Sequence, residues 1–274
     1  MSQPSNFSVG WGGRTILALG YAFLYLPILI LIVFSFNDSK FSVEWEGFTF
    51  RWYHRLLERP EILHGLKLSL LVGLTATLIA TLLGTLLALA LGRHRFAGRR
   101  AIEGFLYLPI VTPEIVVGIS LLILFVLLRL PLGFVTITIA HVAFCISFVV
   151  VVVLARLHGM DQHLEEAAMT LGADEMATFW RVTLPQLWPG IFAGALLAFT
   201  MSFDDFVITS FVSGSGSSTL PIVVYGMARK TVEPSINAIS TIILLVTAVL
   251  IYVADRLVRR DAGRREVRAR DEAA

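Results

Sequence analysis

The apolar residues of this chain fall into six long blocks separated by short polar segments. Each block holds roughly 20 residues, the length that an α-helix needs to cross a hydrocarbon layer of ~30 Å. The pattern therefore predicts an all-α membrane protein with six transmembrane helices. The expected spans are Ile16–Phe36, Leu66–Leu91, Phe105–Leu128, Leu132–Leu154, Gly190–Phe211 and Ile236–Ala254.

The composition agrees with a membrane protein and argues against two other classes. Hydrophobic residues make up 56% of the chain and charged residues 15%, whereas an average soluble domain carries about 25% charged residues. This balance argues against a disordered chain and against an ordinary soluble globule. We expect an N-terminal segment (1–15), a six-helix transmembrane domain (16–258) and a basic tail (259–274).

The positions of lysine and arginine predict the orientation of the chain. Six spans place both termini on one side, and a cytoplasmic assignment puts 14 of the 22 Lys and Arg residues in the cytoplasm. The first span is too long for a signal peptide and no small-residue cleavage site follows it, so we expect a retained helix. The arginines of the tail are interpreted as charges that meet anionic lipid headgroups rather than nucleic acid, because no aromatic residues alternate with them.

The longest inside loop, 155–189, has the pattern of two short helices joined by a turn. Glu165 and Glu166 stand near the start of the first helix, where the helix dipole favours acids, and Gly172 is placed to end it. Two interpretations are open, an amphipathic hairpin lying in the lipid interface and a docking element for a cytoplasmic partner. The acidic first helix favours docking, because interfacial helices prefer Lys and Arg.

The same loop carries a spaced signature. Glu166–Ala168 is followed after three residues by Gly172, and after nine more residues by Val182–Pro185. This resembles the EAA signature of ABC-importer permeases, with Val in place of Ile as its only departure. The resemblance implies a type I ABC importer permease fold (MetI-like), in which the loop forms a coupling helix seated in a groove of the ATPase subunit. The residues that it assigns to this coupling loop are Glu166, Ala167, Ala168, Gly172, Leu184 and Pro185.

Most of the chain, from about residue 15 to residue 258, is similar to the second permease subunit of spermidine/putrescine importers. This resemblance implies a bacterial inner-membrane subunit that pairs with a different permease and docks two copies of an ATPase subunit. It also implies a periplasmic polyamine-binding protein that delivers the cargo, and ATP bound by the partner, so that this chain needs no cofactor. The segments that carry the resemblance are Phe23–Pro27, Ser35–Ser39, Arg51–Tyr53, Ala140–Cys145, Ser202–Phe206 and Ser235–Ala238.

The ionisable groups expected at membrane depth are mostly acidic. Glu114 lies in the third expected span, and Asp204 and Asp205 lie in the fifth. Such residues are costly in a membrane and usually line an internal path, and a path for a flexible polycation favours carboxylates together with aromatic faces such as Phe203 and Phe206. Neighbours on a helix point about 100° apart, so the two aspartates cannot face one spot equally. Alternatively, one of them caps a helix break or forms a hydrogen bond to a neighbouring helix. Glu114 follows a proline and is equally well placed at a broken helix near a membrane face.

Other chemistry finds little support in the sequence. His141 is alone on an apolar face and is interpreted as a hydrogen-bonded packing residue rather than a metal ligand, and the single cysteine, Cys145, as a small buried hydrophobe. No P-loop motif is present, so ATP is not held by such a loop in this chain. Rival functions are a permease for another solute such as iron and, in a different class, an intramembrane aspartyl enzyme. Acidic groups argue against anions as cargo, and adjacent aspartates are a poor arrangement for the enzyme.

Overall fold

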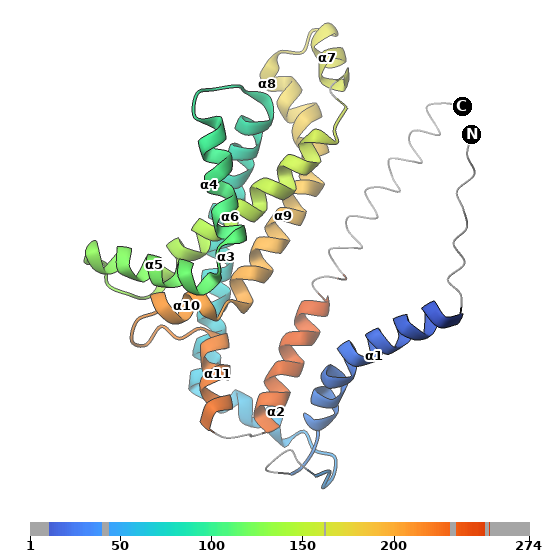
Figure 1. Ribbon diagram of the computed structural model, residues 1–274, viewed down its shortest axis with the longest axis vertical. Coiled ribbons are helices and arrows are strands. Elements are labelled where there is room, and N and C mark those ends of the chain that lie inside the picture. Colours follow the sequence, from blue (N-terminus) through green and yellow to red (C-terminus); the bar gives the residue numbers. More distant parts are fainter. Residues whose placement is uncertain (1–10, 40–43, 162, 231–233, 250–251, 253–274) are drawn as a thin grey trace. The chain divides into compact units, whose positions relative to one another are not determined.

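The computed structural model describes residues 11–39, 44–161, 163–230, 234–249 and 252 (Figure 1). The secondary structure of these residues is helical, apart from an isolated β-bridge between Asn37 and Phe48. The chain divides into two compact units, residues 60–225 with 247–274, and residues 1–59 with 226–246, and each is described in turn. The basic tail expected at 259–274 and the first ten residues of the expected N-terminal segment lie outside the described residues.

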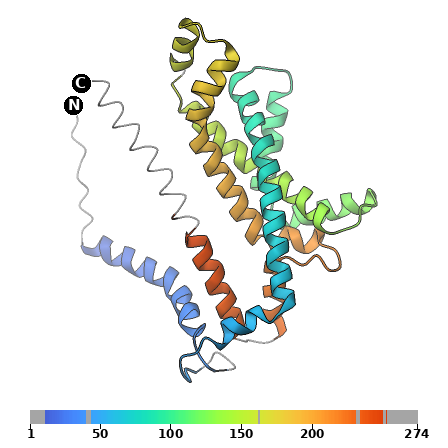
Figure 2. The ribbon, with the colours of Figure 1, turned by 180° about the vertical axis from the view of Figure 1, so that it is seen from behind.

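Three long helices form the core of the first unit. They are α3 (Pro60–Arg93), α6 (Phe134–His158) and α9 (Leu184–Asp204), and each packs against the other two (Figures 1 and 2). Their sequences are strongly apolar, and an α-helix satisfies its own backbone groups in lipid. This unit therefore has a helical core of membrane-spanning length.

Small residues on α3 let its two neighbours approach closely. A Cβ atom added at Gly84 would lie 2.7 Å from Val149 Cγ1 of α6, and one added at Gly73 would lie 3.2 Å from Phe199 Cε2 of α9. Close backbone approach through small residues is a main source of packing energy between helices in a membrane. The glycines of α3 therefore set the spacing of this core.

The third expected span, Phe105–Leu128, is two helices rather than one straight helix. The chain bends by 113° between helix α4 (Arg99–Val111) and helix α5 (Glu114–Leu127). Pro113 has no N–H to donate and disfavours the helical conformation of the residue before it, and Thr112 is extended, with ψ of 135°. The break places Glu114 in the first turn of α5.

The fifth expected span, Gly190–Phe211, is also interrupted. Helix α9 ends at Asp204, and after Asp205 and Phe206 the chain enters the short helix α10 (Val207–Val212). Helix α11 (Leu220–Lys230) follows, and the backbone N–H of Leu220 donates a hydrogen bond of 2.9 Å to Ser69 Oγ of α3. The polar break after α9 and the start of α11 thus both lie against the core helices.

A small hairpin occupies the segment between α6 and α9. It consists of α7 (His163–Thr170), α8 (Glu175–Thr178) and the π-helix η1 (Phe179–Thr183), which runs directly into α9. This is the helix–turn–helix that the sequence predicts for the loop 155–189. We call α7, α8 and the turn between them the docking hairpin.

The second unit contains α1 (Trp11–Phe34), α2 (Arg51–Leu57) and, in the described part, residues 234–246 of a helix at Pro234–Val249. None of the residues of α1 is buried within the described chain, so its apolar surface is available to lipid or to another helix. The segment between α1 and α2 is held by Trp52, whose indole N–H donates to the backbone oxygen of Asn37 at 2.7 Å.

The described helices are compatible with six spans. Four of them are long and apolar enough to cross a membrane, and the bent pair α4–α5 raises this number to five if it counts as one span. The sixth expected span, 236–254, coincides with the helix at Pro234–Val249 and continues into residues that are not described, apart from Tyr252.

Candidate functional site

The turn of the docking hairpin depends on Gly172. This residue has φ of +93°, in the left-handed region that favours glycine, and no atom lies within 4 Å of a Cβ added there. The N–H groups of Leu171, Gly172 and Ala173 donate back to carbonyl oxygens of α7 and close its last turn. Asp174 then caps α8, because its Oδ1 accepts from the N–H of Ala177 at 2.7 Å. The signature glycine is therefore required by backbone conformation, not by crowding.

The docking hairpin presents an acidic and apolar surface. The Glu166 side chain is 69% exposed, and Leu171 and Met176 are exposed large apolar residues of the hairpin. Trp180 of η1, which follows the hairpin, is exposed as well. An open hollow of about 580 Å³ lies between the two arms, where Ala168 and Gly172 are among the lining residues. Exposed apolar side chains beside a shaped hollow are typical of a surface that another protein covers.

The remaining signature residues lie in two places. Ala167 is exposed on α7, whereas Leu184 packs against the apolar core where α9 begins. Pro185 lies in the first turn of α9, directly after the π-helix η1. The signature therefore combines surface residues of the hairpin, Glu166 to Gly172, with residues that anchor it to the bundle.

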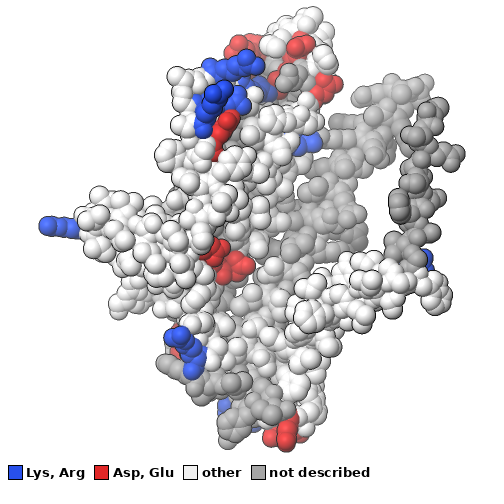
Figure 3. All heavy atoms as spheres, viewed as in Figure 1, with Lys and Arg blue, Asp and Glu red and all other residues white. Residues whose placement is uncertain are grey.

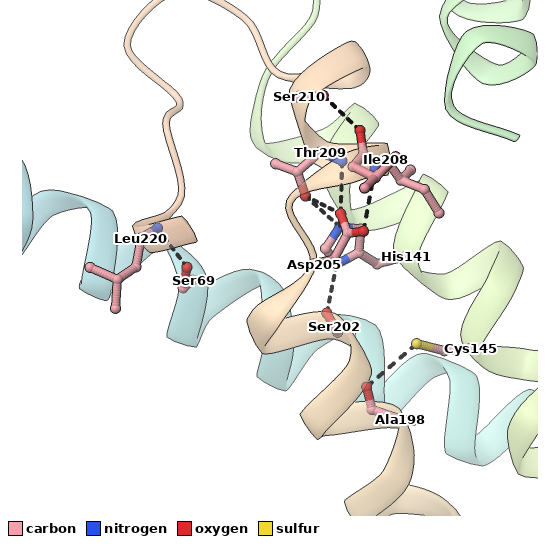
Figure 4. Close-up of polar contacts among 11 residues, drawn as sticks. Ser69, His141, Cys145, Ala198, Ser202, Asp205, Ile208, Thr209, Ser210 and Leu220 are labelled. Atoms are coloured by element: carbon pink, nitrogen blue, oxygen red, sulfur yellow. Dashed lines mark hydrogen bonds and ion pairs between the residues drawn. The ribbon is translucent and has the colours of Figure 1, made fainter. Parts of the chain in front are cut away.

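Asp205 is a buried helix cap. Its side chain is 6% exposed. Its Oδ2 accepts from the N–H of Thr209 at 2.8 Å and from the Thr209 hydroxyl at 2.6 Å, and its Oδ1 accepts from the N–H of Ile208 at 3.3 Å (Figure 4). Both oxygens are thus used to hold the start of α10. These contacts match the alternative in which one aspartate caps a helix break.

His141 on α6 completes a buried polar cluster at the same break. The imidazole is fully buried, with Nδ1 2.6 Å from Ser202 Oγ and Nε2 2.9 Å from Thr209 Oγ1 and 3.4 Å from Asp205 Oδ2 (Figure 4). His141 is therefore the packing residue that the sequence predicts. Ser202 belongs to the segment Ser202–Phe206 named from the sequence, whereas Thr209 was not singled out, although it stands about one helical turn after Asp205. No group of metal-binding side chains occurs among the described residues.

Asp204 lies in a different environment. Asp204 is exposed, as is Glu114 at the start of α5. The two carboxylates are close enough to repel each other electrostatically. Figure 3 shows a patch of acidic atoms in the middle of this face with uncharged surface around it, while other charged atoms lie at the top, at the bottom and at the left edge of the view. The structure thus brings together Glu114 and Asp204, from two different expected spans.

The two phenylalanines of the expected path each pack against another ring. The Phe203 ring stacks on Phe199 at a centroid distance of 5.7 Å, and the Phe206 ring lies 4.4 Å from that of Tyr225. Both phenylalanines are half-buried and flank the two aspartates in the chain. They leave part of their surface beside the acidic groups, where a ring face attracts cations.

Comparison with known proteins gives a family match over most of the bundle. Residues 80–264 match the family described as binding-protein-dependent transport system inner membrane component. The chain is 43% identical over 241 residues to the spermidine/putrescine transport system permease protein PotC of Escherichia coli (strain K12), which covers 88% of this chain and 91% of that protein. It is 42% identical over 252 residues to the putrescine transport system permease protein PotI of the same strain, covering 89% and 90%.

Solved structures share the fold at lower sequence identity. A bacterial ABC transporter involved in the import of the acidic polysaccharide alginate matches with a TM-score of 0.68 at 15% identity, covering 95% of this chain and 98% of that chain. The MetNI methionine ABC transporter in an inward-facing conformation matches with a TM-score of 0.60 at 18% identity, covering 76% and 97%. These matches confirm the all-α, MetI-like permease fold.

Proposed function

Because this chain belongs to the family of binding-protein-dependent transport system inner membrane components, we propose that it is a permease subunit of an ATP-driven importer for polyamines such as putrescine and spermidine. The observation that carries the proposal is 43% identity to a named spermidine/putrescine permease over 88% of the chain. The relatives are transport permeases, so the chain is a transporter component and not an enzyme. It resides in the inner membrane as a multi-pass protein.

The docking hairpin is the surface through which the ATPase drives transport. Its exposed Glu166, its exposed apolar residues and the left-handed turn at Gly172 support this role. In the proposed cycle, ATP binding closes the ATPase subunits and brings the coupling hairpins together. The helical bundle then opens to the opposite side and accepts the cation. ATP is bound by the partner, and this chain supplies no nucleotide site.

The substrate path passes Asp204 and Glu114. A polyamine carries several positive charges along a flexible chain, and two exposed carboxylates in an apolar wall replace part of its hydration. The ring faces of Phe203 and Phe206 add cation–π attraction. Asp205 contributes indirectly, because it holds the helix break that positions its neighbour.

The assembly contains four kinds of protein. One chain carries one docking hairpin and an importer needs two, so we place a second, different permease beside this one and one ATPase copy on each. A periplasmic polyamine-binding protein delivers cargo to the side opposite the hairpin. With the hairpin in the cytoplasm, both termini of this chain are cytoplasmic, as the Lys and Arg bias favours.

The rival functions are less well supported. An iron or other solute permease would share the fold, but the identity to polyamine permeases covers nearly the whole chain. An intramembrane aspartyl enzyme needs two free carboxylates that face each other, and both oxygens of Asp205 already accept hydrogen bonds from α10.

The test is a transport assay of the assembled complex in proteoliposomes. Labelled spermidine, putrescine, ferric iron, sulfate and phosphate are supplied with the cognate binding protein and ATP. We expect ATP-dependent accumulation of the polyamines alone. Accumulation of iron or of an oxyanion in place of polyamines would contradict the substrate assignment while leaving the permease assignment intact.

A further inference from the structure

Glu165 and Glu166 are neighbours on α7 but have opposite exposure. The Glu166 side chain is 69% exposed and the Glu165 side chain 16%. Adjacent residues of a helix point about 100° apart, so one acid of the docking hairpin faces outward and the other faces the bundle. The inward acid therefore has a role different from contact with the ATPase.

Glu165 binds two other elements through a single oxygen. Its Oε1 accepts a hydrogen bond from the Thr183 hydroxyl at 2.6 Å and forms an ion pair with Arg93 Nη2. The same Arg93 Nη2 lies 3.5 Å from Thr183 Oγ1, and Thr183 is fully buried. We call these three residues the Glu165 junction. It joins α7 to the end of α3 and to the last residue before α9.

The Glu165 junction connects the docking hairpin to α3, a helix with which the backbone of α7 makes few contacts. The main backbone contacts of α7 are with α8 and η1, whereas Arg93 is the last residue of α3. The Arg93 side chain is 34% exposed and the Glu165 side chain 16%, so the ion pair is partly exposed to water, whereas the Thr183 hydroxyl that binds the same Glu165 oxygen is buried. The junction therefore links the side chain of an α7 residue to the last residue of α3 and to the residue before α9.

Helices α3 and α9, which the Glu165 junction joins at one end, also contact each other farther along the bundle. Gly73 of α3 lies against Phe199 of α9, and Phe199 stacks on Phe203, next to Asp204. The segment η1 that carries Thr183 is a π-helix, a form that is frequent at functional sites. The junction is thus placed at the hairpin end of the same helix pair that flanks the acidic groups.

From this arrangement we infer that Glu165 is a positioning residue, which transmits displacement of the docking hairpin to α3 and α9. This inference rests on the proposed function, because it requires an ATPase that moves the hairpin. It separates the two acids by role: Glu166 belongs to the docking surface, and Glu165 to the transmission of its movement.

The experiment is a charge swap in the complete complex. The variants Arg93→Glu, Glu165→Arg and the double variant are purified with their partners and reconstituted. For each, retention of the ATPase on the complex and uptake of labelled spermidine per ATP hydrolysed are measured. Arg95→Glu is the matched control, since it makes the same charge change at an exposed residue two positions away. Glu166→Arg is the matched control on α7.

We expect each single variant to retain the ATPase but to lose uptake per ATP by roughly tenfold, which corresponds to about 1.4 kcal/mol. The double variant regains most of that loss because the ion pair is rebuilt with reversed sign. Arg95→Glu remains like the unmodified protein, and Glu166→Arg loses the ATPase itself.

Three results would overturn the inference: unchanged uptake per ATP in both single variants, loss of the ATPase in Glu165→Arg, or no recovery in the double variant. If charge reversal prevents assembly, Glu165→Gln and Thr183→Val are measured instead, and an unchanged ratio there also overturns it. Failure of the unmodified complex to bind an ATPase or to import polyamine is a separate outcome, which removes the proposed function together with the inference.

Discussion

Asp204 and Asp205 are adjacent in the chain, yet the Asp205 side chain is 6% exposed and fully engaged while Asp204 is exposed beside Glu114. The reason is that α9 ends between them, so they no longer follow one helix. Asp205 turns toward α6 and α10, where His141 and Thr209 bind it. Asp205 therefore stabilises the helix break, and the break leaves Asp204 exposed at the surface.

Replacing Asp205 should destabilise the fold. Asp205→Ala removes the acceptor for two N–H groups and leaves buried polar partners unsatisfied, which costs about 1–3 kcal/mol. Thermal unfolding of the purified complex in detergent should show a lowered midpoint. An unchanged midpoint would mean that the cap contributes nothing to stability. Asp204→Ala is the matched control and should leave the midpoint where it is.

Neutralising Asp204 should instead affect transport. Asp204→Asn and Glu114→Gln each remove one charge from the exposed acidic pair, and we expect spermidine uptake to fall roughly tenfold, the effect of losing about 1.4 kcal/mol of attraction. Uptake by reconstituted complex is measured at equal ATPase retention. Normal uptake in both variants would remove the acidic path from the account while leaving the permease fold intact.

Gly172→Ala should weaken docking of the ATPase. An alanine at φ of +93° is strained by about 1–2 kcal/mol, and the turn between α7 and α8 relaxes to another conformation. Co-purification of the ATPase in detergent should decrease. Gly159→Ala offers a control in the same segment, because Gly159 has φ of −87° and tolerates a side chain without strain. Equal ATPase retention in the two variants would show that the turn is not needed for docking.

Gly84→Ala should loosen the core. The added Cβ would lie 2.7 Å from Val149 Cγ1, so α3 and α6 must separate or Val149 must shift, at a cost of about 1–3 kcal/mol. The thermal midpoint of the purified complex should fall. Gly104→Ala in α4 meets no atom within 4 Å and should be neutral or slightly stabilising. A midpoint that falls equally in both variants would contradict the packing argument.

Much of the fold could be predicted from local pattern alone. Apolar blocks of membrane-spanning length located α1, α3, α6 and α9, because helix length and hydropathy are properties of a continuous stretch. The breaks were harder to foresee. Pro113 signals one of them, but the break at Asp205 carries no proline or glycine and depends on His141 and Thr209.

The sequence by itself determined the class of protein, the positions of its long helices and the spaced signature of the docking hairpin, since all three are encoded in composition and spacing along the chain. Only the tertiary structure decided which acids are bound by other elements and which stay exposed. Glu165 and Asp205 are each occupied by partners from other elements, while Glu166 and Asp204 stay exposed beside them. The physical reason is that the environment of a side chain is set by the helices packed around it, and neighbouring residues do not share those contacts.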